Sequence, residues 1–175
     1  LTSSASVKAR QNFTISSNIN INRSWSNNRP SGNRGTNPLQ WAYSVFPNLD
    51  IRDFRDYWVP GKEGLEAMTY HKGTYENPWF LAYEVNNSFD RDRVFGNLKA
   101  DWQLTRNLNL MGRYSLDRFS EKRETKIAPG YSKEPNNGAY GIQSLVSYER
   151  NVDVLATFSE EWGPFSVSVS GGGNA

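Results

Sequence analysis

The chain has 175 residues, a formal net charge of +2 and no cysteine. Charges of both signs are interspersed, so no basic footprint for nucleic acid emerges, and the lack of cysteine excludes a disulfide framework and a thiolate metal site. Aromatic residues make up 14% of the sequence, which argues against disorder, since disordered chains are normally poor in aromatic residues.

The first recognisable pattern is a strand near residues 12–23, which follows a polar stretch at 1–11 that predicts no element. Apolar residues occupy most alternate positions from Phe13 to Ile21, and the positions between them hold asparagine, serine or threonine. Because successive side chains of a strand point to opposite faces, this pattern predicts one apolar and one hydrated face.

A long connection is predicted at residues 26–90. Its start is rich in asparagine, glycine, proline and arginine, and aromatic clusters follow at 39–46 and 77–85. Between them, residues 50–58 alternate aspartate or arginine with aromatic residues, and a short helix is expected there. Connections of this length are uncommon within compact domains and are usually functional.

Residues 92–104 and 108–119 predict a hairpin, with apolar residues mostly at even positions and polar residues mostly at odd ones. A three-residue loop between the strands pairs Leu104 with Leu108, so that both strands turn their apolar residues to the same face. We expect Asn107, the last loop residue, to take the left-handed conformation that such a loop usually needs.

Two more strands are predicted near 145–159 and 165–171, after a further loop at 121–138. A four-residue loop at 160–163 pairs Phe158 with Phe165 and again matches the apolar faces. We interpret the glycines at 171–173 as small residues in a strand where something packs close.

These patterns predict an all-β fold of about five antiparallel strands, joined by long and short connections in alternation. Each apolar stripe lasts only about ten residues before a charge appears on it, which matches the apolar band of roughly 25 Å in an outer-membrane barrel. No apolar run approaches the roughly 18–20 residues that a membrane-spanning helix needs. The patterns therefore favour a segment of a large antiparallel transmembrane β-barrel, with short periplasmic turns and long extracellular loops.

Particular stretches of the sequence resemble a known family. One stretch has Asn-Pro-Trp-Phe-Leu-Ala-Tyr-Glu-Val-Asn-Asn at 77–87, followed by Arg-Asp-Arg-Val-Phe-Gly-Asn at 91–97. The others are Arg-Tyr-Ser-Leu-Asp at 113–117 and Gly-Gly-Gly-Asn at 171–174. From about residue 12 onward, the chain resembles the SusC/RagA family of TonB-dependent outer-membrane transporters.

The resemblance implies an interior segment of a barrel of about 22 strands, with the family's plug domain and TonB box outside this sequence. It implies active import of oligosaccharides or peptides, driven through TonB, together with a SusD-like surface lipoprotein that closes the barrel as a lid. The expected location is the bacterial outer membrane, in contact with its lipid, and no catalytic residue, metal or cofactor is implied. Because the sequence begins at Leu1 and ends in what resembles the middle of a strand, we expect both ends to lie inside a longer polypeptide.

Aromatic residues of the long connection are the candidates for contact with substrate or partner, because aromatic rings stack on sugars and pack against peptides. We favour a structural or partner-binding role for them over direct substrate contact. A second set, on the polar face of the central hairpin, is expected to line the barrel lumen in an ion network that supports the plug. The first set is Trp41, Tyr43, Tyr57, Trp58, Trp79 and Tyr83, and the second is Lys99, Asp101, Arg113 and Asp117.

Two other hypotheses stay open at this point. A secreted carbohydrate-binding β-sandwich would use the same aromatic residues on its loops. A β-rich glycosidase would need a pair of carboxylates, for which the candidates are Asp90, Asp92, Asp101, Glu160 and Glu161, although 160–161 is better interpreted as a solvated turn. The only histidine, His71, is interpreted as a solvated loop residue.

Overall fold

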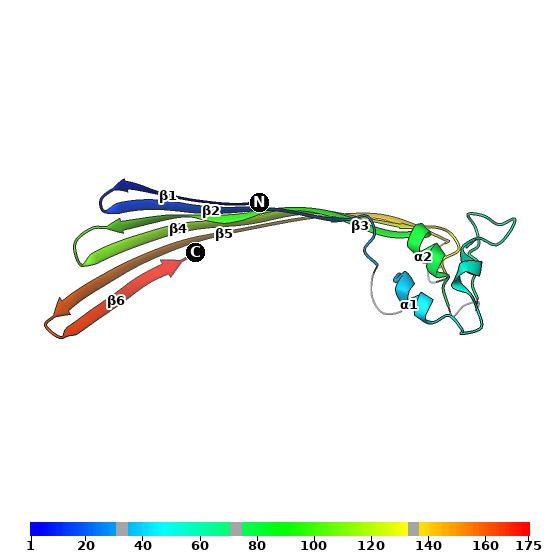
Figure 1. The fold of residues 1–175 in the computed structure, drawn as a ribbon. Coiled ribbons are helices and arrows are strands. Elements are labelled where there is room, and N and C mark those ends of the chain that lie inside the picture. Colours follow the sequence, from blue (N-terminus) through cyan, green and yellow to red (C-terminus); the bar gives the residue numbers. More distant parts are fainter. Residues whose placement is uncertain (31–34, 71–74, 133–136) are drawn as a thin grey trace. The chain divides into compact units, whose positions relative to one another are not determined.

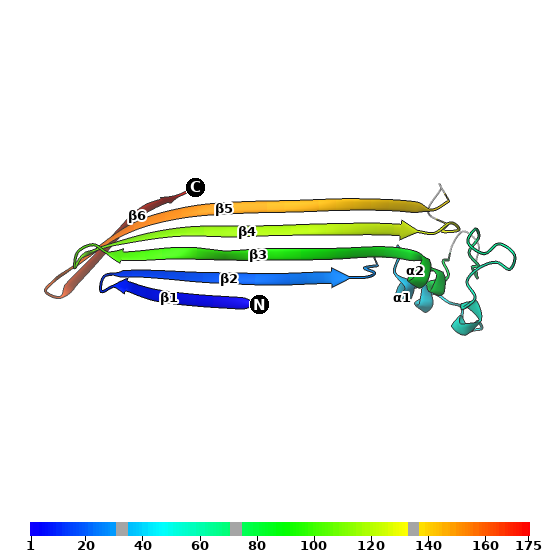
Figure 2. The same cartoon turned by 90° about the horizontal axis from the view of Figure 1, so that it is seen from above.

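The computed structural model describes residues 1–30, 35–70, 75–132 and 137–175, and its fold is all-β. Over these residues, six antiparallel strands form one sheet in which each strand lies beside its neighbour in the chain (Figures 1 and 2). The strands are β1 (Thr2–Arg10), β2 (Phe13–Ser26), β3 (Val85–Gln103), β4 (Leu108–Ile127), β5 (Ala139–Trp162) and β6 (Phe165–Asn174).

Three short helical elements lie in the connection between β2 and β3. They are α1 (Pro38–Tyr43), the 3-10 helix η1 (Ile51–Phe54) and α2 (Pro78–Glu84). The helix expected within 50–58 is therefore present as η1, whereas α1 and α2 fall in the two aromatic clusters. None of the helices in the described part of the chain is long and apolar enough to span a membrane.

The chain divides into two compact units. Unit 1 comprises Leu1–Arg23, Arg91–Ser120 and Leu145–Ala175, and unit 2 comprises Ser24–Asp90 and Glu121–Ser144. Among the described residues, every buried hydrophobic side chain belongs to unit 2.

Unit 1 is a single layer of sheet, all of which the structure describes, and it contains no buried hydrophobic side chain. Strand alternation places its large apolar residues on one face, where they stay open to solvent. Leu98 is 53% exposed, Val154 56% and Val169 63%. This face therefore has no covering layer within the unit.

The strand β1 corrects the expectation that residues 1–11 form no element. It pairs with β2 so that Val7 lies opposite Ile15 and Ser3 opposite Ile19, with an irregularity between Lys8 and Arg10. Serine and alanine dominate the side of β1 that continues the apolar face, so its sequence carries no hydrophobic alternation. Backbone pairing with β2, which the sequence of β1 alone does not reveal, is what makes it a strand.

The strands β3, β4 and β5 also extend well beyond their predicted limits. The extra residues are mostly polar or charged, and a stretch without apolar alternation does not predict a strand. Side-chain pairing supports the extension, since Thr125 Oγ1 donates to Asn87 Oδ1 at 2.9 Å. The strands therefore continue where the apolar band ends.

The central hairpin has the predicted pairing but not the predicted loop conformation. The Leu104 N–H donates to the Leu108 carbonyl at 2.9 Å, which confirms the three-residue loop. Asn107 does not have a positive φ, so the expectation of a left-handed residue is wrong. Instead, Thr105 Oγ1 accepts from the N–H groups of Asn107 (3.3 Å) and Leu108 (3.1 Å) and closes the turn.

The last hairpin departs from the prediction in its register. Trp162 pairs with Phe165 across a two-residue turn, and Phe158 pairs with Val169 rather than with Phe165. Gly163 has a φ of +60°, a conformation that this tight turn needs and that glycine adopts without strain because it has no side chain. The residues at 160–161 are therefore strand and not a solvated turn; the shift of register is even, so the faces stay matched.

A close backbone approach at Gly96 supplies a first prediction. A Cβ at this position would lie 2.0 Å from the backbone oxygen of Asn18, so Gly96→Ala forces β2 and β3 apart. We expect the substitution to lower the free energy of unfolding by about 1–3 kcal/mol, as overpacking does elsewhere. Urea unfolding of the two proteins measures the loss.

Gly112→Ala on β4 is the matched control, since a Cβ there would meet no atom within 4 Å. Equal midpoints for Gly96→Ala and Gly112→Ala would contradict the close approach. The same contact occurs at Gly172, where a Cβ would lie 2.2 Å from the Val154 oxygen, and this confirms the interpretation of the 171–173 glycines at their central position.

Candidate functional site

The four residues expected on the polar face of the central hairpin all take part in ion pairs. Lys99 Nζ lies 2.9 Å from Asp101 Oδ2, and Arg113 Nε lies 2.8 Å from Asp153 Oδ2. Asp117 receives two hydrogen bonds from Arg93, of which Nε to Oδ1 is 2.9 Å long. Partly exposed pairs such as these balance the charges of this face without adding much stability.

Amide and hydroxyl groups fill the rest of this face with hydrogen bonds. Asn18 Nδ2 donates to Ser4 Oγ (3.1 Å), and Asn20 Nδ2 donates to Asn18 Oδ1 (2.7 Å). Near the short turns, Asn109 Nδ2 donates to Gln103 Oε1 at 3.2 Å. These bonds pre-organise a polar surface along β1 to β4.

A shallow hollow of about 360 Å³ lies on the same face. The Phe95 ring stands among its amides and carboxylates, with the Arg93 guanidinium 4.8 Å from the ring centroid. This combination supplies hydrogen-bond donors, acceptors and one aromatic surface. Its lining residues are Asn18, Asn20, Phe95, Gly96, Asn97, Ser115, Leu116, Asp117, Glu149 and Asn151.

The six loop aromatic residues divide between the core of unit 2 and its surface. Trp41 is 4% exposed and donates from Nε1 to the Gly35 carbonyl at 3.0 Å, so it is a core residue. Trp58 also packs against that core, with its ring edge-on to Phe80 at 5.3 Å. At the other extreme, Tyr43 is 91% exposed.

The other three rings stack in a row, which we term the aromatic ladder: Trp79, Tyr83 and Tyr57. Trp79 and Tyr83 lie one turn apart on α2, and their rings are 6.4 Å apart and 6° from parallel. Tyr57 also stacks on Tyr83, with ring centroids 6.1 Å apart and planes 18° from parallel. Arg55 covers the Trp79 ring at 5.8 Å, and Tyr83 remains 59% exposed.

A hollow of about 470 Å³ adjoins the ladder through Tyr57. Charged side chains stand beside the aromatic rings there, which is a suitable surface for a ligand that has both polar groups and flat apolar faces. The hollow is lined by Arg55, Asp56, Tyr57, Trp58, Pro60 and Glu63.

Polar contacts fix the position of the ladder. Trp79 Nε1 donates to the Ile51 carbonyl and the Tyr57 hydroxyl donates to Glu84 Oε1, both at 2.9 Å. Burial, together with this bond to the Glu84 carboxylate, raises the pKa of Tyr57. These hydrogen bonds hold the Trp79 and Tyr57 rings in place.

Asn77 is the residue that orders this region. It is fully buried, and its Oδ1 accepts from the Trp79 N–H (2.9 Å) and the Phe80 N–H (3.4 Å), which caps α2. Its Nδ2 donates to the carbonyls of Phe54 (2.9 Å) and Met68 (3.0 Å). One side chain thus joins α2 to two other segments of unit 2.

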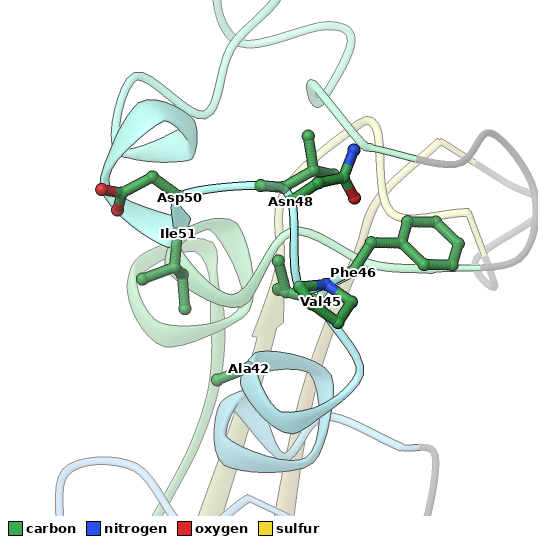
Figure 3. Close-up of a pocket in the computed structure, with 8 residues that line it drawn as sticks. Ala42, Val45, Phe46, Asn48, Asp50 and Ile51 are labelled. Carbon is green, nitrogen blue, oxygen red and sulfur yellow. The ribbon is translucent and has the colours of Figure 1, made fainter.

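A larger hollow, of about 560 Å³, lies between the end of α1 and η1 (Figure 3). The Phe46 ring and the Asp50 carboxylate stand at its rim and point away from each other. Asp50 is engaged by its neighbour Arg52, whose Nε donates to both carboxylate oxygens at 2.9 Å. The hollow therefore brings together no set of groups suited to catalysis.

Asp50 supplies a second prediction, on pH. Hydrogen bonds from the Arg52 side chain and backbone lower the pKa of Asp50 from 3.8 to about 2. A lowered pKa stabilises the folded state above the unfolded pKa, so this contribution is complete above about pH 4 and is lost as the pH falls toward 2. Carboxyl-carbon NMR of the protein is expected to show Asp50 titrating near 2, and Arg52→Ala moves its pKa toward 3.8.

Arg55→Ala is the control for that titration, because the Arg55 guanidinium lies over the Trp79 ring, 5.8 Å from its centroid. An Asp50 pKa near 3.8 in the unaltered protein would show that the Arg52 contact does not form in solution.

Four of the carboxylates considered for glycoside hydrolysis, Asp92, Asp101, Glu160 and Glu161, are spread over β3 and β5. Asp92 lies 3.8 Å from Arg23, whereas Asp101 pairs with Lys99. Even and odd positions of β3 point to opposite faces, so these two carboxylates cannot flank one sugar. Glu160 and Glu161 lie within β5, opposite Val167 and Ser166.

Sequence reasoning missed two signals for this site. Both α-helices begin with Asn-Pro, in which the asparagine caps the helix and the proline takes the first position. The spacing of four between Trp79 and Tyr83 then predicts that their rings meet on one helix face. His71 lies outside the described residues, and within those residues no group of three or more His, Cys, Asp or Glu could hold a metal ion.

Comparison with known proteins found no family model that matches the chain and no similar curated protein.

Proposed function

We propose that the chain forms part of the wall and outer loops of a β-barrel in the bacterial outer membrane, and that the barrel is an active importer of the SusC/RagA type. The observation that carries this proposal is the uncovered apolar face of unit 1. In water, such a face would favour aggregation, whereas lipid hydrocarbon covers it without a protein partner. The polar opposite face then lines the lumen.

The distribution of charge along the strands supports the same proposal. Arg23 and Asp92 meet on the apolar side at 3.8 Å, and Arg150 lies 4.7 Å from the Tyr148 ring centroid on that side. Between these positions and the short turns, the side chains of that face are almost all apolar. Aromatic rings gather near the turns, where Phe13 meets Trp102 at 6.3 Å, as in an interfacial girdle.

The lumen face supports transport rather than catalysis. Its ion pairs and amides offer many weak polar contacts over several strands, which suits passage of a hydrated solute or support of a plug. We propose oligosaccharides or peptides as the substrates, with energy supplied through TonB and a SusD-like lipoprotein as lid. In this arrangement Tyr43 and Tyr83, the most exposed of the six loop aromatic residues, contact the substrate or the lid.

Cell fractionation combined with uptake tests this proposal. The protein is expected in the outer-membrane fraction, with the heat-dependent gel mobility of a folded barrel. Deletion of its gene is expected to abolish uptake of one class of oligosaccharide or peptide, and collapse of the proton gradient is expected to do the same. Recovery of the protein from the soluble periplasmic or culture fraction would overturn the proposal in favour of a secreted carbohydrate-binding module.

Tyr83→Ala in the complemented strain tests the loop surface by itself. Tyr83 contributes an exposed ring and no core contact, so barrel assembly is expected to be normal while uptake falls several-fold. Tyr140→Ala is the control, because it removes another exposed tyrosine of unit 2 from outside the ladder. Normal uptake by Tyr83→Ala would exclude a functional contact at the ladder.

A further inference from the structure

The apolar face of unit 1 has a hollow of about 410 Å³ that opens above Gly96. Gly96 contributes no side chain there, whereas the surrounding positions carry large apolar groups. The hollow is fixed by the backbone, because a Cβ at Gly96 would collide with the Asn18 oxygen at 2.0 Å. It is lined by Ser17, Ile19, Val94, Phe95, Gly96, Asn97, Leu98, Tyr114 and Leu116.

Two arginines stand at the end of this hollow. Arg118 follows the lining residue Leu116 by two positions on β4 and so lies on the same face. The Ser159 N–H donates to the Asn107 carbonyl at 2.8 Å, which places these two residues opposite each other. Nine residues further from the turn along each antiparallel strand, Arg150 lies beside Leu116. The guanidinium of Arg150 lies over the Tyr148 ring.

The charges of this pair are not neutralised by the described part of the chain. Neither Arg118 nor Arg150 forms an ion pair with any described residue, whereas Arg23 on the same face pairs with Asp92. Guanidinium groups bind phosphate oxygens through two parallel hydrogen bonds. A tyrosine beside them, here Tyr148, is frequent where lipid head groups meet the hydrocarbon.

We infer that this face carries a binding site for one anionic phospholipid, with an acyl chain in the hollow above Gly96 and the phosphate between Arg118 and Arg150. The inference rests on the proposed function, since it requires the apolar face to meet lipid. The apolar lining is complementary to the acyl chain, and the two arginines are complementary to the phosphate. A free phosphate would leave the hollow empty, and an uncharged chain would leave the arginines without an anion.

Native mass spectrometry of the full-length protein, released from detergent micelles, tests the site. The probes are dimyristoyl phosphatidylglycerol, dimyristoyl phosphatidylcholine and inorganic phosphate. We expect one phosphatidylglycerol to be retained about tenfold better than phosphatidylcholine, because each arginine near an anionic lipid adds to the attraction. Inorganic phosphate alone is expected not to bind.

Two variants separate the parts of the site. The double variant R118Q/R150Q is expected to lose the preference for phosphatidylglycerol, and Ile19→Trp, which fills the hollow, is expected to reduce retention of both lipids. The controls are Arg106→Gln in the short turn and Val154→Trp on the same face outside the hollow. Unchanged retention and preference in R118Q/R150Q would overturn the inference, as would equal retention of the two lipids by the unaltered protein.

Flotation of the same protein with phosphatidylcholine vesicles distinguishes failure of the phospholipid site from failure of the proposed membrane location. A protein that floats but shows no lipid preference keeps the proposed membrane location and loses the phospholipid site. A protein that does not float loses both.

Discussion

Leu98→Arg is expected to prevent the protein from accumulating in the outer membrane. Leu98 is 53% exposed near the middle of the apolar face, so in the proposed orientation the new charge would face lipid hydrocarbon. An arginine at the bilayer midplane costs a transmembrane barrel about 2–4 kcal/mol, a large part of the stability of an ordinary protein. Immunoblotting of membrane fractions, together with heat-dependent gel mobility, measures the folded protein.

Asn97→Arg is the matched control, because it places the same charge on the adjacent residue, which points to the polar face. Asn97 lines the polar hollow beside Asp117 and Glu149, where an arginine finds carboxylates and water. We expect near-normal levels of folded protein. If Leu98→Arg accumulated as well as Asn97→Arg, the apolar face would have to be covered by something other than lipid.

Asn77→Ala is expected to have the largest effect on unit 2. The substitution removes the cap of α2 and also leaves the buried carbonyls of Phe54 and Met68 without their donors. A lost cap costs about 1 kcal/mol and each buried unsatisfied group about 1–3 kcal/mol, so we expect a loss of roughly 3 kcal/mol. Limited trypsin digestion is expected to cleave 52–62 much faster, because cleavage requires the backbone around its arginines and lysine to unfold locally, and the opened loop permits this.

Two further variants divide that effect into its parts. Asn77→Ser keeps an oxygen to cap α2 but is too short to donate to the two carbonyls, so an intermediate cleavage rate is expected. Asn37→Ala removes the corresponding cap of α1, a single bond to the Leu39 N–H at 3.1 Å, and is expected to change cleavage little. Equal protection of Asn77→Ala and Asn37→Ala would mean that the Asn77 donor bonds do not order the loop.

The sheet was predictable wherever one face is apolar. Strict alternation located β2 and the central hairpin, and matching of the faces gave the pairing of Leu104 with Leu108. The same rule fails for β1, whose pairing with β2 depends on a neighbour rather than on its own pattern. It also fails for the last turn, because a register moved by an even number of residues matches the faces equally well.

The candidate site was less predictable, because its geometry arises between segments that are distant in sequence. The sequence identified all six loop aromatic residues but did not separate Trp41, which is buried, from Tyr83, which is exposed. That division depends on how the loop folds around Asn77. The ion pairs of the polar face were easier to predict, since alternation alone places Lys99, Asp101 and Arg113 on one side of the sheet.

The order of the strands has a consequence for how such a sheet can change over evolutionary time. Since every strand pairs with its immediate neighbour in the chain, a hairpin is a self-contained module with matched inner and outer faces. Duplication or deletion of one hairpin leaves the direction and facing of all other strands unchanged, whereas gain or loss of a single strand reverses the direction of every strand after it. The sheet can therefore grow or shrink two strands at a time, and the connection between β2 and β3 can be exchanged for another without altering that count.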